Sequence, residues 1–220
     1  SNCVVNLSND KQSVFNEIYR VLKDGGEVHI SDVFTNKDVG DAARANPMLV
    51  GECMGNALDL QTFVNLMKTA GFSNIYPVEA RFVPTPGRPD DILDPSVDFF
   101  SVTFSAFKFS SPIQDEWNGT WCKYLGGIES DENGFEFDMF HTFKVNEKTF
   151  IGTLMKEVLS QSRYGKFFEF GRDETNIPPH PEAHDFIQTV LNTKPKEDEA
   201  PQTGQSCCGC CCCCNGQNPA

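Results

Sequence analysis

The order of hydrophobic patterns in the first 34 residues most limits the fold. Residues 1–7 form an apolar run typical of the end of a buried strand, and Asp10 can cap a helix after it. Gly25-Gly26 ends that helix, because glycine accepts a positive φ, and residues 27–34 form a short β-branched strand. The helix shows one apolar stripe, made of Val14, Phe15, Ile18, Val21 and Leu22. The order strand, helix, strand predicts a βαβ unit with a parallel sheet and a right-handed crossover.

The segments that follow predict an antiparallel end to the same sheet. After an irregular, polar stretch over residues 35–58, Asp59 can cap a second helix, which Gly71 closes. Its apolar face consists of Leu60, Phe63, Val64 and Met67. A strand is predicted over residues 75–83 and, after a loop rich in Pro, Gly and Asp, another over 99–109, where residues alternate. A doubly wound sheet can finish with such an antiparallel partner.

The pattern changes near residue 112. Strands are predicted over residues 121–125, 135–143 and 167–170, with a short helix from Thr153. From residue 172 on, Pro, Glu, Asp and Lys dominate, a composition typical of disorder. The resulting division is an α/β domain (residues 1–111), a small α+β domain (112–171) and a disordered tail with a Cys-rich end (172–220).

Charge argues against several classes of partner. The 220 residues carry a formal net charge of −13 at pH 7, which disfavours nucleic acid and anionic membrane surfaces. No apolar run approaches the roughly 18 residues of a membrane span. The sequence has no initiator Met and begins inside an apolar run. We therefore expect a fragment that is truncated at its N-terminus, so that any targeting signal lies outside the given sequence.

The ten cysteines are unevenly spread. Seven lie at positions 207, 208 and 210–214, and only Cys3, Cys53 and Cys122 lie elsewhere. Three scattered cysteines are too few for a disulfide framework, so reduced thiols and a cytoplasmic location are expected. Cys3 and Cys53 each lie beside small or polar residues at the edge of a predicted element, where a sulfur can be reached. Such a pair can hold a soft, sulfur-seeking element.

Several motifs resemble the C-terminal half of arsenite methyltransferases. They are Ser1-Asn2-Cys3-Val4-Val5-Asn6-Leu7, Tyr19-Arg20-Val21-Leu22-Lys23, Gly25-Gly26-Glu27, Ser31-Asp32-Val33, Gly51-Glu52-Cys53, Ser101, Thr103-Phe104, Phe107-Lys108, Gly126-Gly127-Ile128, Leu159 and Ser162-Arg163. They run in order over residues 1 to about 170, and the two Cys motifs together are highly specific. The resemblance implies the trailing half of a class I methyltransferase (Rossmann-like) sheet, followed by a small α+β C-terminal domain and a disordered Cys-rich tail.

The resemblance also implies an activity: methyl transfer from S-adenosylmethionine to trivalent arsenic, an arsenic detoxification. Cys3 and Cys53 would be the catalytic and substrate-binding thiolates, with an upstream cysteine completing the set, and Asn2 would contact the cofactor. Glutathione or thioredoxin would deliver the arsenic or restore reduced thiols. In the family, most of the cofactor site, including a Gly-rich loop, lies upstream of the matched residues, so the 220 residues alone are expected to be inactive.

The chemistry suits these residue types. Thiolates bind trivalent arsenic on one side of a pyramid and leave its lone pair free to attack a methyl group. Cys3 follows a strand end at the carboxyl edge of the sheet, where open α/β folds bind ligands, and Cys53 lies in a loop that can fold over that edge. Gly51 and Gly55 would permit the turns of this loop. Both cysteines are expected to be partly exposed, with helix N-termini nearby.

Other residues have simpler interpretations. A lone cysteine is usually a small buried hydrophobe, which we expect of Cys122. Glu52 is expected to be a solvated loop carboxylate, whereas Asp32 is left open between facing the site and capping a turn. His180 and His184 lie four apart in a Pro-rich segment and are interpreted as linker, so no metal site is predicted. The Cys207–Cys214 run lacks the spaced pairs of a folded zinc site and favours at most weak thiol scavenging.

Two rival functions remain. One is a methyltransferase of the same fold that acts on another small molecule, for which Cys3→Ser and Cys53→Ser would leave turnover intact. The other is a non-catalytic, thiol-based metal(loid)-binding protein that relies on the tail, for which cutting the chain after about Pro201 would abolish binding. The first has no need of two placed thiols, and the second does not account for motifs in the folded part.

Overall fold

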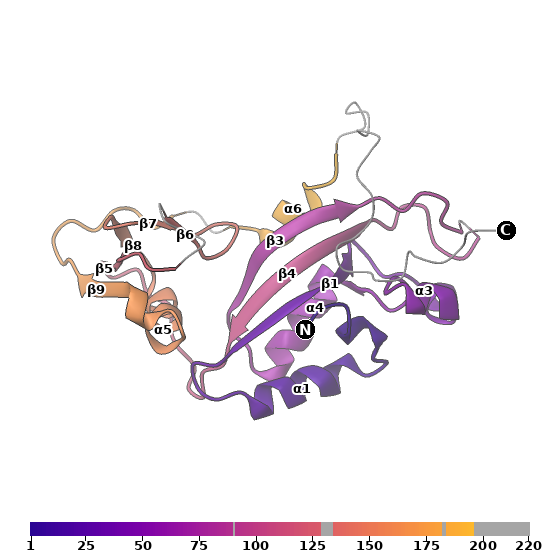
Figure 1. The fold of residues 1–220 in the computed structure, drawn as a ribbon, viewed down its shortest axis with the longest axis horizontal. Coiled ribbons are helices and arrows are strands. Elements are labelled where there is room, and N and C mark those ends of the chain that lie inside the picture. Colours follow the sequence, from indigo (N-terminus) through magenta and orange to yellow (C-terminus); the bar gives the residue numbers. More distant parts are fainter. Residues whose placement is uncertain (90, 129–133, 182–183, 196–220) are drawn as a thin grey trace.

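The computed structural model describes residues 1–89, 91–128, 134–181 and 184–195, which form two packed units (Figure 1). In the described part of the chain, every helix is too short or too polar to cross a membrane. The prediction made for Cys207–Cys214 concerns residues outside the described ranges.

The first unit is built around a four-stranded sheet with the order β2-β1-β4-β3. Its elements are η1 (Val5–Leu7), α1 (Lys11–Val21), β1 (Glu27–Thr35), α2 (Asp41–Arg44), α3 (Pro47–Gly51), β2 (Leu58–Asp59), α4 (Leu60–Ala70), β3 (Ile75–Val83) and β4 (Phe99–Phe107). The short β2 is parallel to β1, whereas β4 lies antiparallel between β1 and β3. The predicted antiparallel end of the sheet is therefore confirmed.

The predicted strand over residues 1–7 is largely absent. Only Asn2 forms a bridge, parallel to Ser31 of β1, and the chain then turns into the 3₁₀ helix η1. The turn closes because the Leu7 and Ser8 amides donate to the Val4 and Val5 carbonyls at 3.1 Å each. The parallel pairing expected of a βαβ unit is thus present in reduced form.

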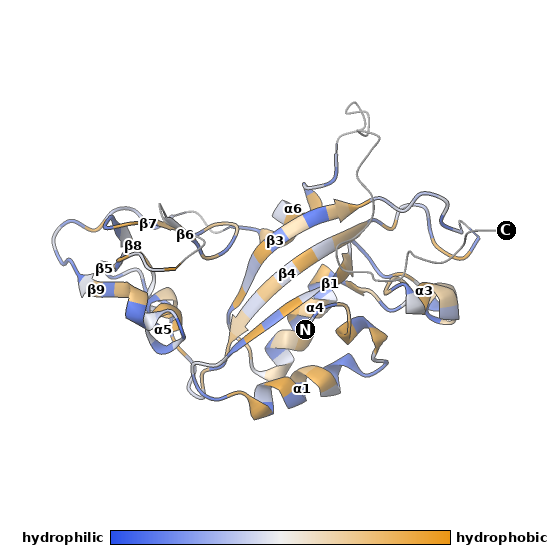
Figure 2. Cartoon of the chain, in the orientation of Figure 1, coloured by the Kyte–Doolittle hydropathy of each residue, from blue (hydrophilic) through white to orange (hydrophobic). Residues whose placement is uncertain are grey.

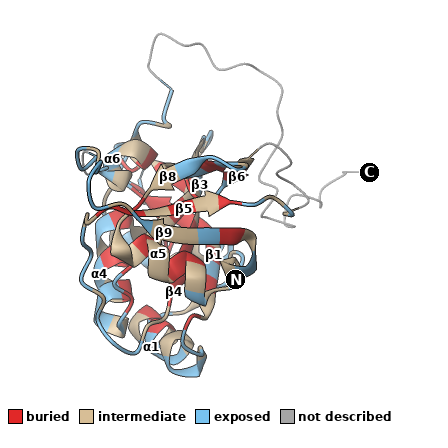
Figure 3. Ribbon diagram, turned by 90° about the vertical axis from the view of Figure 1, so that its left-hand side faces the viewer, coloured by how far each residue is buried: buried red, intermediate tan, exposed pale blue. Residues whose placement is uncertain are grey.

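One face of the sheet carries the main core, against α1, α4 and the later helix α6 (Phe186–Leu191). Every second residue of β1 and β4 points to this face, and the strands show the matching alternation of hydropathy (Figure 2). The buried members of this core on β1 and β4 are Val28, Ile30, Phe34, Phe100, Val102, Phe104 and Ala106. The Phe63 ring of α4 stacks on Phe104 with centroids 4.7 Å apart. Many of the buried residues, drawn red in Figure 3, lie where the sheet and these helices meet.

Local signals placed the two long helices, with two exceptions. The helix α1 ends at Val21 with Leu22 as its C-cap, and not at Gly25-Gly26 as predicted. Asp10 and Asp59 accept hydrogen bonds from the Ser13 and Thr62 amides and cap α1 and α4. Gly71 ends α4 with φ 114°, as expected of a C-cap glycine. Val21, predicted in the apolar stripe of α1, is 60% exposed, because α1 ends there and the chain turns away.

The second unit has its own core. Its elements are β5 (Thr120–Tyr124), β6 (Gly134–Glu136), β7 (Thr142–Lys144), β8 (Lys148–Phe150), α5 (Thr153–Gln161), η2 (Gly165–Phe167) and β9 (Phe168–Arg172). One strand was expected over residues 135–143, but β6 and β7 form a hairpin there. The Asp138 carboxylate turns the chain, because it accepts the backbone amides of Phe140 and His141 at 2.8 and 2.7 Å.

The expectation of disorder from residue 172 on is wrong for part of that segment. Residues 186–191 form α6, which Asp185 caps by accepting the Gln188 amide. Val190 is fully buried, and the Phe186 ring meets Phe104 edge-on at 5.8 Å. Burial against the sheet stabilises a helix too short to form alone.

Candidate functional site

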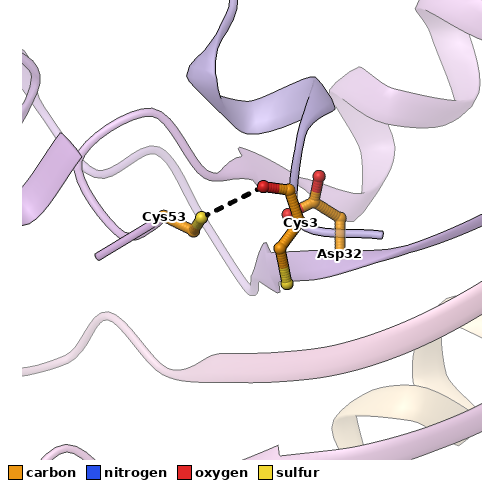
Figure 4. Close-up of side chains that lie close together, drawn as sticks. All are labelled: Cys3, Asp32 and Cys53. Carbon is orange, nitrogen blue, oxygen red and sulfur yellow. Dashed lines mark hydrogen bonds between the residues drawn. The ribbon is translucent and has the colours of Figure 1, made fainter. Parts of the chain in front are cut away.

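Three side chains from separate segments meet toward the carboxyl end of β1 (Figure 4). The ligand atoms of Cys3, Asp32 and Cys53 all lie within 4.8 Å of one another. Within the described residues this is the one such group of His, Cys, Asp and Glu side chains. The two cysteines are fifty residues apart in sequence, so the fold brings together the pair on which the sequence analysis depends.

Backbone pairing to β1 places Cys3. The Cys3 amide donates to the Ser31 carbonyl at 2.9 Å, and the Ser31 amide donates to the Ser1 carbonyl at 2.9 Å. Asn2, between these bonds, is exposed. Its proposed contact with a cofactor is not tested by the fold and stays a prediction.

The loop after α3 places Cys53. Its amide donates to the Val50 carbonyl at 3.0 Å, and its sulfur donates to the Cys3 carbonyl at 3.5 Å. Only 5% of Cys53 is exposed, because Val33 and Leu49 are among the residues of the apolar cluster around it. The expectation of partial exposure is therefore confirmed for Cys3, which is half-buried, and wrong for Cys53.

Both cysteines adopt left-handed backbone angles. The φ values are 50° for Cys3 and 61° for Cys53, and in the described chain Asn146 is the one further non-glycine residue of this kind. Such a conformation costs a residue with a Cβ about 1–2 kcal/mol. Cys53 itself therefore makes the turn that was assigned to its flanking glycines. Strained residues of this kind concentrate at functional sites.

Gly55 has a different role from the one expected. A Cβ at this position would lie 2.7 Å from the Ala43 carbonyl oxygen and 2.8 Å from the Val50 amide nitrogen. Gly55 thus allows the Cys53 loop to pack closely on α2 and α3, whereas Gly51 has open space around it.

A carboxylate oxygen of Asp32 lies within 4.8 Å of both sulfurs, which favours the first of the two roles that the sequence left open. The register partner of Asp32 on β4 is Val102, and only 2% of Asp32 is exposed. Burial raises the pKa of the Asp32 carboxyl, and hydrogen bonds from the Val33 and Asn6 amides and the charge of Lys11 partly offset this rise.

Asn6 organises the site, and the sequence analysis missed it. Its side-chain amide donates to Asp32 Oδ1 at 2.8 Å, to the Val33 carbonyl at 2.6 Å and to the Cys53 carbonyl at 3.5 Å. Its backbone amide donates to Asp32 Oδ2 at 3.2 Å. One buried side chain therefore ties η1, β1 and the Cys53 loop together. An asparagine inside an apolar run was the available signal.

An open cleft of about 530 Å³ lies at the N-termini of α1 and α4, close along the chain to Cys53. Its charged and polar lining includes Asp10, Lys11, Asp38, Arg44, Asn56 and Asp59. Asn56 follows the Cys53 loop and donates to Asn9 Oδ1 at 3.2 Å. Cys3 and Cys53 are not among its lining residues, so the expected nearness of helix N-termini to the two sulfurs stays a prediction.

The other candidate residues behave as the simpler interpretations predicted. Glu52 is exposed, and Cys122 is fully buried. His180 contacts the Trp117 ring at 5.1 Å, whereas His184 stacks on Phe140 at 4.5 Å. The two histidines therefore pack on different aromatic partners, and the absence of a metal site at this segment stays a prediction.

Cys122 should resist alkylation in the native protein. Burial raises its pKa from 9.0 to about 12, so at a given pH its thiolate fraction is about 1,000-fold smaller than that of an unperturbed thiol. We expect iodoacetamide at about pH 8 to modify the Cys122 peptide only after unfolding in urea, as measured by mass spectrometry. Equal rates in the native and unfolded protein would contradict the buried position of β5.

Comparisons with known proteins show what the chain resembles as a whole. Residues 119–214 match the family described as the arsenite methyltransferase C-terminal domain. Arsenite methyltransferases from Mus musculus and Homo sapiens are each 31% identical over 95% of this chain and 58% of their own length. Over almost its whole length, the chain is similar to arsenite methyltransferases. It spans about three fifths of the length of these curated arsenite methyltransferases.

A solved structure extends the likeness to the fold. The crystal structure of an arsenic(III) S-adenosylmethionine methyltransferase from Chlamydomonas reinhardtii superposes with a TM-score of 0.73 at 29% identity. The match covers 83% of this chain and 61% of that one. The mixed α/β fold is therefore that of an arsenite methyltransferase.

Proposed function

We propose that this protein acts in methyl transfer from S-adenosylmethionine to trivalent arsenic, with the arsenic bound by Cys3 and Cys53. The observation that carries the proposal is the convergence of the two sulfurs, within 4.8 Å of one another, on two residues with left-handed backbone angles. The similarity to arsenite methyltransferases supports the same reaction.

Two adjacent thiolates suit trivalent arsenic. The element is soft and prefers sulfur over oxygen, and two sulfurs from one protein bind it far more tightly than one. Cys3 and Cys53 are held by backbone hydrogen bonds on opposite sides of the site, so little rearrangement is needed on binding. The third arsenic position is left for a hydroxide, an external thiol or another cysteine.

The thiolates orient the arsenic for the transfer step. S-adenosylmethionine, when bound, supplies an electrophilic methyl group on a sulfonium. With the arsenic held by Cys3 and Cys53, its lone pair would form the new As–C bond, and the electrons of the broken C–S bond would stay on the departing thioether. Holding the lone pair in line with the methyl group removes a large entropic barrier. Arsenic is formally oxidised by two electrons, so thiols such as glutathione or thioredoxin would return it to the trivalent state.

Arsenic binding by the chain itself tests the proposal. All samples carry Ser in place of the seven cysteines at 207, 208 and 210–214, which keeps the chain at full length and removes the tail thiols. We call this the tail-serine protein. Equilibrium dialysis with arsenite should give one arsenic per chain, and X-ray absorption at the arsenic edge should show As–S bonds to two protein sulfurs. Loss of all binding on removing the tail thiols would instead favour a tail-based metal(loid)-binding protein.

A further inference from the structure

Asp32 adds a carboxylate to the two sulfurs, and arsenic chemistry does not require it. We infer that Cys3, Asp32 and Cys53 also form a binding site for a thiophilic divalent cation of the zinc class. The site uses the residues proposed to bind arsenic, but the inference does not depend on arsenic binding or methyl transfer.

The spacing of the donor atoms fits such a cation. Zinc binds thiolate sulfur at about 2.3 Å and carboxylate oxygen at about 2.0 Å in a tetrahedron, so its ligand atoms lie roughly 3.5–3.8 Å apart. The three donor atoms lie within 4.8 Å of one another, so any pair needs to close by at most about 1.3 Å. Water or another ligand would fill the fourth position.

The carboxylate is held as metal ligands usually are. Asp32 Oδ1 accepts the Val33 amide at 2.8 Å and the Asn6 side chain at 2.8 Å, while Oδ2 accepts the Asn6 amide at 3.2 Å. The Val5 amide also hydrogen-bonds to this carboxylate, so its roughly four acceptor positions are engaged and a metal would replace the weakest of these contacts. Hydrogen bonds of this kind orient ligands and raise metal affinity.

Charge explains why Asp32 would discriminate between ligands. Two thiolates and a carboxylate bring three negative charges into a largely buried site, and Lys11 is the cation whose charge acts on Asp32. A divalent cation offsets this charge directly, whereas arsenous acid enters as a neutral molecule. Zinc should therefore compete with arsenite at this site, and removing the Asp32 charge should weaken zinc binding much more than arsenite binding.

Cobalt(II), a spectroscopic substitute for zinc, tests the site in the tail-serine protein. We expect tetrahedral d–d bands and thiolate-to-cobalt charge-transfer absorption, both lost on titration with zinc. Asp32→Asn should raise the zinc dissociation constant about 100-fold while changing arsenite affinity less than about threefold. Asp138→Asn is the matched control, since that carboxylate is also buried and accepts two backbone amides, and it should leave zinc binding unchanged.

A second measurement needs no substitution in the site. X-ray absorption at the zinc edge should show two sulfur ligands with the remainder oxygen. Coordination by oxygen and nitrogen alone, or zinc affinity unaffected by Asp32→Asn in a folded protein, would overturn the inference. Either result leaves the arsenic proposal standing if arsenite still binds through two sulfurs. If zinc binds through two sulfurs but arsenite does not, the arsenic proposal alone is refuted.

Discussion

Replacing either Cys3 or Cys53 by Ser in the tail-serine protein is expected to weaken arsenite binding by about 100-fold to 10,000-fold. Once one sulfur is attached, the second is presented from a neighbouring segment at high effective concentration, and each substitution removes this advantage entirely. The variant that carries both substitutions should bind arsenite only as weakly as a protein that has no pair of adjacent thiols. Equilibrium dialysis with arsenic quantified by mass spectrometry gives the three dissociation constants.

Cys122→Ala is the control for this experiment. That cysteine is fully buried in the second unit, so its removal should change stability and leave arsenite affinity within about twofold. If the two Ser variants bound arsenite as tightly as the parent, the methyltransferase on another small molecule would become the better proposal. If Cys122→Ala alone lost binding, the placement of the site at β1 would be wrong.

Elements specified by neighbouring residues were predictable from the sequence. The helix α4 has its capping Asp59, its apolar face and its terminal Gly71 within 13 residues, and β3 was predicted with the correct ends. The helix α6 was missed, because its stability comes from burying Val190 against a sheet that lies far away in the sequence. The β6–β7 hairpin was missed because one carboxylate, that of Asp138, turns an otherwise apolar segment.

Some features of the candidate site were likewise predictable from the local sequence, and others were not. Cys3 and Cys53 were recognisable from residue type, spacing and family resemblance. Their left-handed φ angles were not, since nothing in the local sequence requires them and packing of the whole unit imposes them. Asp32 could not be assigned to the site until the fold brought one of its carboxylate oxygens within 4.8 Å of both sulfurs. Asn6 acts through hydrogen bonds to residues 26 to 47 positions away, which no local pattern reveals.

Asn6→Ala should therefore affect both stability and the site. The substitution removes donors to a buried carboxylate and to the Val33 carbonyl, so the free energy of unfolding should fall by about 2–4 kcal/mol. The Cys53 loop also loses its bond to η1, at 3.5 Å from the Cys53 carbonyl oxygen. Arsenite affinity should then fall about tenfold in the native state although both sulfurs remain, because binding must reorder the loop. Urea unfolding and arsenite dialysis on the same sample measure the two effects.

Asn74→Ala separates these effects. The Asn74 side chain is also buried, donates to the Phe107 carbonyl at 3.0 Å and accepts the Phe107 amide at 2.7 Å, away from the site. Its removal should lower stability to a similar extent without changing arsenite affinity. A tenfold loss in Asn6→Ala alone identifies Asn6 as a positioning residue for Cys53. Equal affinities in the two variants would mean that the strained backbone at Cys53 holds its conformation without the asparagine, and that Asn6 serves only the stability of the fold.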